Sequence, residues 1–289
     1  MECFRSVFNM TFRNFEVILI DNGSTDGSGQ AVLDTFQNVR VVHLDRNMGY
    51  GKAVNQGIVA SEGIYIGVLD NDTVVDPSWL SELVRVIDGD ANNGIVGSKV
   101  YFHSTDRIIY SAGGILDQRN GLTRVLGLGS QDSGKFDQLR EVDWVDGCAI
   151  LIKRAVIEKA GYFDEGYGFY REDIDLCQKA HMLGYRTLYV PTSIVWHKGS
   201  TTSTKLGLKF YYLHRSWIRY VIIHSRRRYV LLGVLFASLL TLGESIAHVL
   251  RGNRGAIQQA IGALAWNFVF LPVTLAYRRK VRRLGKGRK

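Results

Sequence analysis

Short apolar runs ending in aspartate alternate with helical segments along residues 15–70, and this order constrains the fold most. "FEVILID" (15–21), "VRVVHLD" (39–45) and "YIGVLD" (65–70) have the length and composition of buried strands in a parallel sheet. "GSGQAVLDTF" (27–36) and "GKAVNQGIVAS" (51–61) predict helices between these strands. We therefore expect an α/β fold with a mostly parallel sheet, in which ligands bind at the carboxyl ends of the strands.

The following part of the chain is less regular. Residues 95–150 are richer in glycine and β-branched side chains, which predicts antiparallel strands or long loops. Residues 164–185 lead into a helix, and "TLYVP" (187–191) predicts a last strand. A length of 289 residues with 46% hydrophobic content suffices for one large domain plus an appendage, or for two modest domains.

Acidic side chains are concentrated at the predicted carboxyl edge of the sheet. Asp21, Asp45 and Asp70 end three of the strands, and Asp72 follows one residue after Asn71. Carboxylates gathered in a partly dry cleft repel one another by several kcal/mol unless a cation or a hydrogen-bonding ligand lies between them. Oxygen ligands with few imidazoles suit Mg²⁺ or Mn²⁺. The alternative is that Asp-Asn-Asp is only a turn, because these residue types favour turns after strands.

Two further segments contribute polar groups of the same kind. "FYREDIDL" (169–176) supplies Glu172, Asp173 and Asp175 at the start of a helix, where the helix dipole favours acids in any case. "WHKGSTTS" (196–203) places His197 after an apolar strand, and a lone histidine there is usually structural. Neither segment identifies a site when taken alone.

The segment "NMGYGKAVNQGI" (47–58) brings polar and flexible residues to a helix start. Backbone N–H groups around Asn47 and Gly49, together with the cation of Lys52, are placed to face an anionic donor. The segment is not a G-x-G-x-x-G fingerprint, because Val54 stands where the third glycine belongs. This argues against a dinucleotide-dependent dehydrogenase.

Six segments in order resemble the family 2 glycosyltransferases of the GT-A fold, and more narrowly the rhamnosyltransferase-like members that build bacterial surface polysaccharides. The resemblance runs from about residue 2 to residue 203. The segments are "NFEVILIDNGSTDGS", "NMGYGKAVNQGI", "LDNDTVVDPSWL", "WVDGCAILIKR", "GYFDEGYGFYREDIDLCQKAHMLGY" and "WHKGS".

The resemblance implies roles for individual residues. Asp21 would bind the nucleotide base, and Asp70 with Asp72 would form the DxD-type motif, touching ribose and metal respectively. Asp173 would be the general base, and His197 would help to hold the metal or the diphosphate.

Further roles concern the acceptor and the donor. Glu172 would orient the acceptor, and the turn carrying Trp144 and Asp146 would face it, although an aromatic residue at that place also suits a core. Asn47 and Lys52 would contact the nucleotide-sugar donor.

The chemistry of glycosyl transfer is consistent with these roles. Charge grows on the departing diphosphate and is stabilised by a cation, which suits Asp72. The acceptor hydroxyl loses its proton to a carboxylate on the opposite face of the sugar, which suits Asp173. One such base implies inversion at the anomeric carbon, in contrast to the two carboxylates that flank the bond in glycosidases.

One feature departs from the family pattern. Members normally begin with a strand of the type "VSIIIVTYN", and Met1 falls where the helix after that strand should begin. A central strand of about ten residues is therefore expected to be missing, unless the natural start lies upstream or another segment fills the gap; a truncated protein is the remaining alternative. An open slot between parallel strands leaves backbone groups unpaired, so we expect the chain as given to be destabilised or weakly active.

The basic residues are concentrated in the last part of the chain. The net charge is +9, but from Lys205 onward 17 Lys and Arg stand against the single acid Glu244. "KLGLKFYYLHRSWIRYVIIHSRRRY" (205–229) has the basic amphipathic pattern of a helix at an anionic membrane surface, and a core helix is the alternative. The long apolar runs that follow exclude nucleic acid as the partner.

Two apolar runs in this tail predict membrane helices. Residues 229–243 are uncharged, and residues 255–277 are long enough to span a bilayer. Basic residues at 226–228 and 278–289 outnumber the two arginines of the joining loop, which would place both ends in the cytoplasm. Because Gln258, Gln259 and Pro272 weaken a clean span, re-entrant or interfacial helices are the alternative.

The three cysteines and the first residues bear on the compartment. Cys3, Cys148 and Cys177 form neither a disulfide framework nor a CxxC metal pattern, which favours packing roles and a reducing compartment. Residues 1–17 contain no apolar run of the length that a secretory signal needs.

Together these features predict a GT-A domain over residues 1–204 and membrane-associated helices over residues 205–289. The predicted activity is metal-dependent, inverting transfer of a sugar, rhamnose being one candidate, from a nucleoside diphosphate donor to a lipid-linked glycan. The predicted place is the cytoplasmic face of the cell membrane. A polyprenyl-phosphate glycosyltransferase and an inactive membrane-bound scaffold are the alternatives. The oligomeric state is left open.

Overall fold

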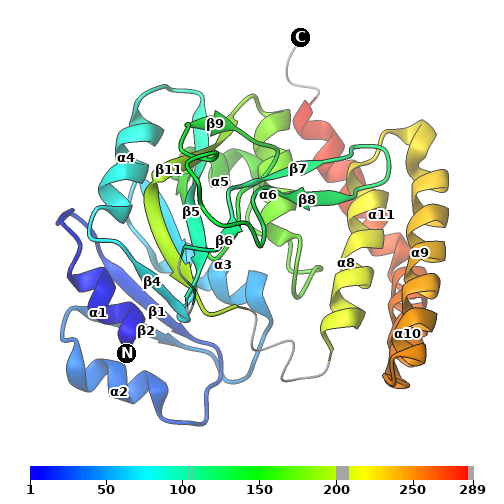
Figure 1. Ribbon diagram of the computed structural model, residues 1–289, viewed down its shortest axis with the longest axis horizontal. Coiled ribbons are helices and arrows are strands. Elements are labelled where there is room, and N and C mark those ends of the chain that lie inside the picture. Colours follow the sequence, from blue (N-terminus) through cyan, green and yellow to red (C-terminus); the bar gives the residue numbers. More distant parts are fainter. Residues whose placement is uncertain (104, 106, 200–207, 286–289) are drawn as a thin grey trace.

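A seven-stranded sheet forms the centre of the computed structural model, which describes residues 1–103, 105, 107–199 and 208–285 (Figure 1). Five strands lie in the order β3 (Tyr65–Leu69), β10 (Ala149–Lys153), β5 (Asn93–Phe102), β11 (Arg186–His197) and β4 (Thr73–Val75). The short strands β6 (Ile109–Ser111) and β9 (Arg140–Glu141) pair with β5 and β11. A separate hairpin is formed by β7 (Gly114–Leu116) and β8 (Thr123–Val125).

The predicted strands and helices of the first seventy residues are present, but their sheet is divided. β1 (Val17–Asp21) and β2 (Val39–His43) pair in parallel with each other and form a sheet of their own. Within the described residues, no strand pairing joins β1 to β3. The helices of this part are α1 (Glu2–Phe8), α2 (Ser28–Thr35) and α3 (Tyr50–Ala60).

The central sheet is mixed, so the expectation of a mostly parallel sheet is wrong. Only β5 and β11 pair in parallel within it, whereas β10 runs antiparallel to both β3 and β5. The cause is β10, which inserts between β3 and β5 in the antiparallel direction; only its first two residues fall within residues 95–150, for which the sequence predicts antiparallel strands or long loops. The α/β class and the central sheet are as predicted.

Helices cover both faces of the sheet. Ile95 and Val96 are adjacent on β5 and completely buried, and they belong to two different core clusters, because successive strand residues point to opposite faces. One cluster includes Leu83 of α4 (Trp79–Asp88), and the other includes Val156 of α5 (Arg154–Ala160) and Leu176 of α6 (Glu172–Met182). Cys3, Cys148 and Cys177 are buried and free, in keeping with the packing roles predicted for them.

The C-terminal helices pack against the α6 side of this core (Figure 1). They are α8 (Lys209–His224), the 3₁₀ turn η1 (Arg227–Tyr229), α9 (Val230–Leu250), α10 (Gly255–Val269) and α11 (Leu271–Leu284). Tyr220 and Ile223 of α8 and Val281 of α11 belong to the same buried cluster as Ile95 of the sheet. The predicted boundary between residues 204 and 205 lies outside the described residues, as do the last residues of "WHKGSTTS" and of the basic tail.

One helical stretch in the described part of the chain, Arg227–Leu250, is long and apolar enough to cross a membrane. The second apolar run does not form a straight helix. α10 and α11 meet at an angle of 64°, with Pro272 at the start of α11. Since proline cannot donate a backbone hydrogen bond, it begins a new helix at this place.

Candidate active site

Two aspartates and a histidine meet where β3 ends and β4 begins. The hydroxyl and the N–H of Thr73 both donate to the carbonyl of Asp70, which closes a tight turn through Asp72. β4 pairs antiparallel with the end of β11, with Thr73 opposite His197. The pairing brings His197 Nε2 to 3.2 Å from Asp72 Oδ1, and ligand atoms of Asp70, Asp72 and His197 all lie within 4.8 Å of one another.

The electrostatics of this cluster favour a cation. Burial, followed by the charge of Asp72, raises the pKa of Asp70 to about 7. Burial is the largest influence on His197 and opposes its protonation, but the hydrogen bond to Asp72 and the charges of the nearby carboxylates together outweigh burial and raise the pKa of the imidazole. His197 Nδ1 is buried without a hydrogen-bond partner among the described residues. Two carboxylates and one imidazole with an unused buried nitrogen fit a hard divalent cation such as Mg²⁺ or Mn²⁺.

A second acidic cluster lies at the start of α6. The N–H of Gly147 donates to Asp173 Oδ2 at 3.0 Å, and the N–H of Ile174 donates to Asp173 Oδ1 at 2.7 Å. Burial, followed by the charge of Asp146, raises the pKa of Asp173 to about 6. The group therefore ionises just below neutral pH, in the range that suits a general base.

Glu172 differs from the adjacent Asp173 in its hydrogen bonding and in its pKa. It is only 8% exposed, and its Oε2 has no hydrogen-bond partner among the described residues. Burial, followed by the charge of Asp173, raises the pKa of Glu172 well above its ordinary value. A protonated Glu172 beside an ionised Asp173 gives one hydrogen-bond donor and one proton acceptor at the same place. This arrangement suits the orienting role that the sequence predicts for Glu172.

Tyr50 connects the two clusters, and sequence reasoning missed it. Its hydroxyl lies 3.1 Å from Asp70 Oδ1 and 3.2 Å from the carbonyl oxygen of Gly147, whose N–H binds Asp173. The only signal in the sequence is an aromatic residue between the two glycines of "GYG" at a helix start. A tyrosine packed at such a place needs a hydrogen-bond partner for its hydroxyl, which points to a polar neighbour.

Asp21 lies at the end of β1, outside the metal cluster. Ser24 N–H donates to its Oδ1 at 2.9 Å, and hydrogen bonds from Ser24 are the main reason that the pKa of Asp21 is lowered. The next residue, Asn22, contacts Asn47 and the carbonyl of Gly49, which directly precedes Tyr50. Asp21 and Asn47 thus reach the same edge as Asp70 through a chain of contacts, and Lys52 lies in the first turn of α3.

Of the two residues predicted to face the acceptor, Trp144 is buried and Asp146 is partly exposed. Trp144 is 6% exposed and packs against the backbone of Gly114, where even a Cβ atom would overlap its ring. An aromatic platform for a sugar needs an exposed ring face, so this placement does not provide the acceptor contact predicted for Trp144. Asp146 is partly exposed and accepts a hydrogen bond from Cys148 N–H, and its charge acts on Asp173.

Two of the other acids named in the sequence analysis lie away from the clusters. Asp175 is completely buried and binds Lys179 and His224, on the side of α6 that faces the C-terminal helices. Asp45 follows the end of β2 and is exposed. The carboxylates that lie close enough for their charges to interact are therefore Asp70, Asp72, Asp146, Glu172 and Asp173.

Comparison with known proteins gives a consistent family. The family model described as Glycosyl transferase family 2 matches residues 1–161. The N-acetylglucosaminyl-diphospho-decaprenol L-rhamnosyltransferase of Mycobacterium tuberculosis is 29% identical over 216 residues, covering 66% of this chain and 69% of the relative. The poly-beta-1,6-N-acetyl-D-glucosamine synthase of Staphylococcus aureus is 25% identical over 193 residues, covering 66% of this chain and 44% of the relative.

Solved structures show the same GT-A fold. GalNAc-T7 with UDP, GalNAc and Mn²⁺ superposes with a TM-score of 0.60 at 21% identity, covering 76% of this chain and 44% of the other. The mannosyltransferase of Pyrobaculum calidifontis in complex with GDP-Man and Mn²⁺ gives a TM-score of 0.57 at 17% identity, covering 99% of this chain and 78% of the other. At these identities the likeness concerns the fold.

Proposed function

The chain belongs to glycosyl transferase family 2, and on that premise we propose that it transfers a sugar from a nucleoside diphosphate donor to a lipid-linked glycan with inversion. One observation carries this proposal. A cation-binding triad of Asp70, Asp72 and His197 and a general-base candidate, Asp173, are joined through the single hydroxyl of Tyr50. Transfer needs these two functions close together, one for the leaving diphosphate and one for the acceptor.

The residues of the triad would hold a divalent cation. When bound, that cation supplies positive charge to the departing diphosphate. The relatives of known structure support this assignment, because both were solved with Mn²⁺. Asp21 and Asn47, at the neighbouring edge, are assigned to the nucleotide.

On the acceptor side, Asp173 takes the proton of the attacking hydroxyl. The new bond forms between that oxygen and the anomeric carbon, while the bond from this carbon to the diphosphate oxygen breaks and its electron pair leaves with the diphosphate. Protonated Glu172 donates a hydrogen bond to the acceptor and orients it. A single base opposite the leaving group gives inversion.

The C-terminal helices support a lipid-linked acceptor. α9 and the α10–α11 bend carry exposed apolar side chains, among them Leu231, Leu235, Leu239, Ile246, Phe268 and Val273. Exposed arginines at 226–228 adjoin this face. An apolar face bordered by cations fits an anionic bilayer surface, where a lipid-linked substrate is held. The name of the mycobacterial relative, a transferase acting on a diphospho-decaprenol, supports the same acceptor class.

The test is transfer by the purified full chain in mixed micelles. A panel of nucleotide sugars, including an L-rhamnose donor, is assayed for release of nucleoside diphosphate with Mg²⁺, Mn²⁺ or a chelator. We expect release with one donor that needs both the cation and a lipid diphosphate-linked sugar. Asp173→Asn should abolish it, while Asp34→Asn, an exposed aspartate of α2, should leave it unchanged.

The reaction product distinguishes this proposal from the two alternative functions, a polyprenyl-phosphate glycosyltransferase and an inactive scaffold. A disaccharide on the lipid diphosphate supports it. A monosaccharide attached directly to polyprenyl phosphate would show that the lipid phosphate is the acceptor. Absence of turnover with every donor would contradict an enzymatic function.

A further inference from the structure

The segment Asp164–Arg171 precedes α6 and holds an unfavourable backbone conformation. Tyr170 has φ of 65° and Arg171 has φ of 72°, so two successive residues with side chains lie in the left-handed region. Non-glycine residues avoid this region, and they stay there only when the surrounding structure holds them. The residues that follow directly are Glu172 and Asp173. Hydrogen bonds from α8 hold the segment along its length.

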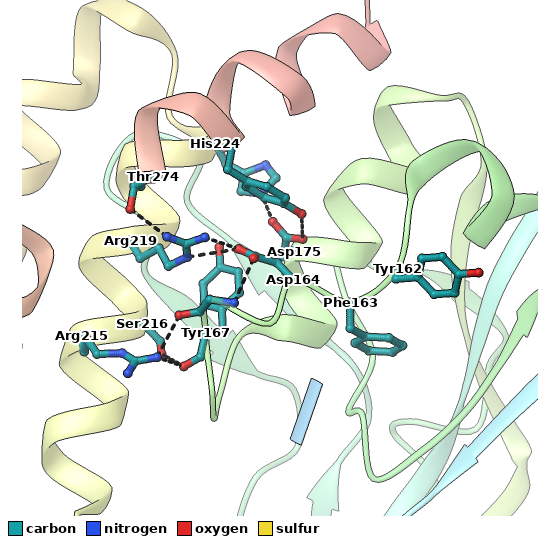
Figure 2. A network of polar contacts seen from close by, with 12 residues as sticks. Tyr162, Phe163, Asp164, Tyr167, Asp175, Arg215, Ser216, Arg219, His224 and Thr274 are labelled. Carbon is teal, nitrogen blue, oxygen red and sulfur yellow. Dashed lines mark hydrogen bonds and ion pairs between the residues drawn. The ribbon is translucent and has the colours of Figure 1, made fainter. Parts of the chain in front are cut away.

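Arg219 of α8 holds the first residue of this segment (Figure 2). It is 2% exposed, and its Nε and Nη2 donate to Asp164 Oδ2 at 3.1 and 2.6 Å. Its Nη1 donates to Thr274 Oγ1 of α11 at 2.7 Å. One guanidinium thus joins α8 and α11 to the first residue of the segment. A lysine at this position has no comparable planar set of donors.

The preceding turn of α8 holds the middle of the same segment (Figure 2). Arg215 Nη2 donates to the carbonyls of Gly166, at 2.9 Å, and Tyr167. Ser216 Oγ donates to the carbonyls of Tyr167, at 3.3 Å, and Phe169, at 2.8 Å. Since residues four apart share a helix face, Arg215 and Arg219 act on the segment from the same side.

The opposite side of the segment faces the site. The N–H of Tyr50 donates to the carbonyl of Gly168 at 3.0 Å, and the Tyr50 hydroxyl binds Asp70. The segment therefore lies between α8 and the residue that connects the two acidic clusters. A change in its path moves Tyr50 and the start of α6 together.

We propose that Arg219 is a positioning residue for sugar transfer, which holds Asp164 so that the segment Asp164–Arg171 presents Asp173 to the acceptor. The inference rests on the proposed function. It assigns α8 a role in catalysis in addition to packing. It also gives a route by which the placement of the C-terminal helices on a membrane acts on the catalytic base.

The experiment compares wild type with Arg219→Lys and Asp164→Asn in the full chain. We expect kcat to fall by about 10- to 100-fold, because a displacement of about 1 Å has that effect, with donor KM changed by less than about twofold. The affinity for nucleoside diphosphate with Mn²⁺, measured by calorimetry, should stay within about twofold as well. Amide hydrogen exchange over residues 164–171 should become faster in both variants, while exchange in β5 stays slow.

Arg278→Lys is the matched control. Arg278 also joins α11 to α8, through the carbonyls of Ile222 and Ile223, but among the described residues it makes no hydrogen bond or ion pair with the segment 164–171. The Arg278→Lys variant should keep the wild-type kcat and the wild-type rate of amide hydrogen exchange over residues 164–171. Should Arg219→Lys fail to fold, Ser216→Ala replaces it, since that change removes only the hydrogen bonds to Tyr167 and Phe169.

Two results in the variants Arg219→Lys and Asp164→Asn would overturn the inference while the proposed function stands. One is unchanged exchange over residues 164–171, and the other is a kcat within twofold of an active wild type. An equal loss of kcat in Arg278→Lys would reduce the role of Arg219 to general packing and would also contradict it. A wild type without turnover on any donor would remove the proposed function and this inference together.

Discussion

The hydroxyl of Tyr50 lies 3.1 Å from Asp70 Oδ1 and is shared with the carbonyl of Gly147. The peptide of Gly147 in turn donates to Asp173. The Tyr50 hydroxyl therefore sets the distance between Asp70, on the donor side, and Asp173, on the acceptor side.

Replacing Tyr50 by phenylalanine removes this connection without changing the shape of the core. We expect a loss of about 0.5–1.5 kcal/mol in the free energy of unfolding, the usual contribution of one hydrogen bond. Transfer should fall more than stability does, by about tenfold or more in kcat/KM, because the two clusters lose their fixed spacing. Steady-state kinetics and denaturant titration measure the two effects. Tyr65→Phe, whose hydroxyl binds Asp88 instead, is the control and should keep wild-type kinetics.

Divalent cations should stabilise the protein through Asp70, Asp72 and His197. At a hundredfold excess over Kd, binding to the folded state alone adds about 2.7 kcal/mol to the free energy of unfolding. We expect His197→Ala to lose most of this gain, measured as the rise in Tm on addition of Mn²⁺. Asp34→Asn should show the full rise. An equal rise in His197→Ala would mean that the cation binds elsewhere.

The rate of transfer should depend on the ionisation of Asp173. Its pKa is raised to about 6, and a base acts only when deprotonated, so the rate should fall as pH drops through this value. Asp146→Asn removes a neighbouring negative charge, which lowers the pKa of Asp173 and moves the acidic limb to lower pH, by about one unit or less. The profile of kcat/KM against pH, scaled to each plateau, measures the shift. The exposed control Glu62→Gln should leave the profile in place.

In the absence of metal, Asp70 should make the free energy of unfolding fall as pH rises. Most carboxylates have the opposite effect, because folding lowers their pKa. The folded state holds the proton of Asp70 up to about pH 7, whereas the unfolded chain loses it near its ordinary pKa of 3.8. Between these values the folded state binds more protons, so stability falls as pH rises. We expect the difference in Tm between pH 6 and pH 8 to be smaller in Asp70→Asn than in wild type. Equal differences would show that Asp70 does not contribute.

Binding to anionic vesicles should depend on the exposed side of α9. Leu235 and Leu239 are 54% and 60% exposed, and charged residues there oppose insertion into a bilayer. The double change Leu235→Glu and Leu239→Glu should weaken binding by about tenfold or more, as expected from the burial of two leucines. Co-sedimentation with anionic vesicles measures it. Val59→Glu with Ile64→Glu, two exposed apolar residues of the catalytic part, is the control and should bind as wild type does.

Much of the fold was predictable because it depends on short-range patterns. The strand ending at Leu69 and the helix starting near Tyr50 follow from apolar periodicity and from glycine at the helix start, which act within a few residues. Asp70 and Asp72 at the end of one strand were recognisable for the same reason. The family resemblance added His197, whose place beside Asp72 depends on pairing between β4 and β11.

Other features required contacts between distant segments. Trp144 has the sequence context of an exposed platform, but Gly114 leaves space for its ring inside the core. The sheet was expected to be mostly parallel, yet β10 inserts between β3 and β5 in the antiparallel direction. Composition left α8 between a membrane surface and a core, and tertiary contacts decide for the core, because Tyr220 and Ile223 belong to the buried cluster and Arg219 is buried with them.

The sequence by itself determined the residue types at the carboxyl edge, the order of the first strands and helices, and the apolar, basic character of the tail, because each is a property of neighbouring residues. The tertiary structure alone decided which acids lie close together, with Asp173 facing Gly147 and Asp175 facing His224. The physical reason is that the ionisation and the partners of a buried carboxyl group depend on the charges and peptides that packing places around it, and these come from elements far apart in the chain.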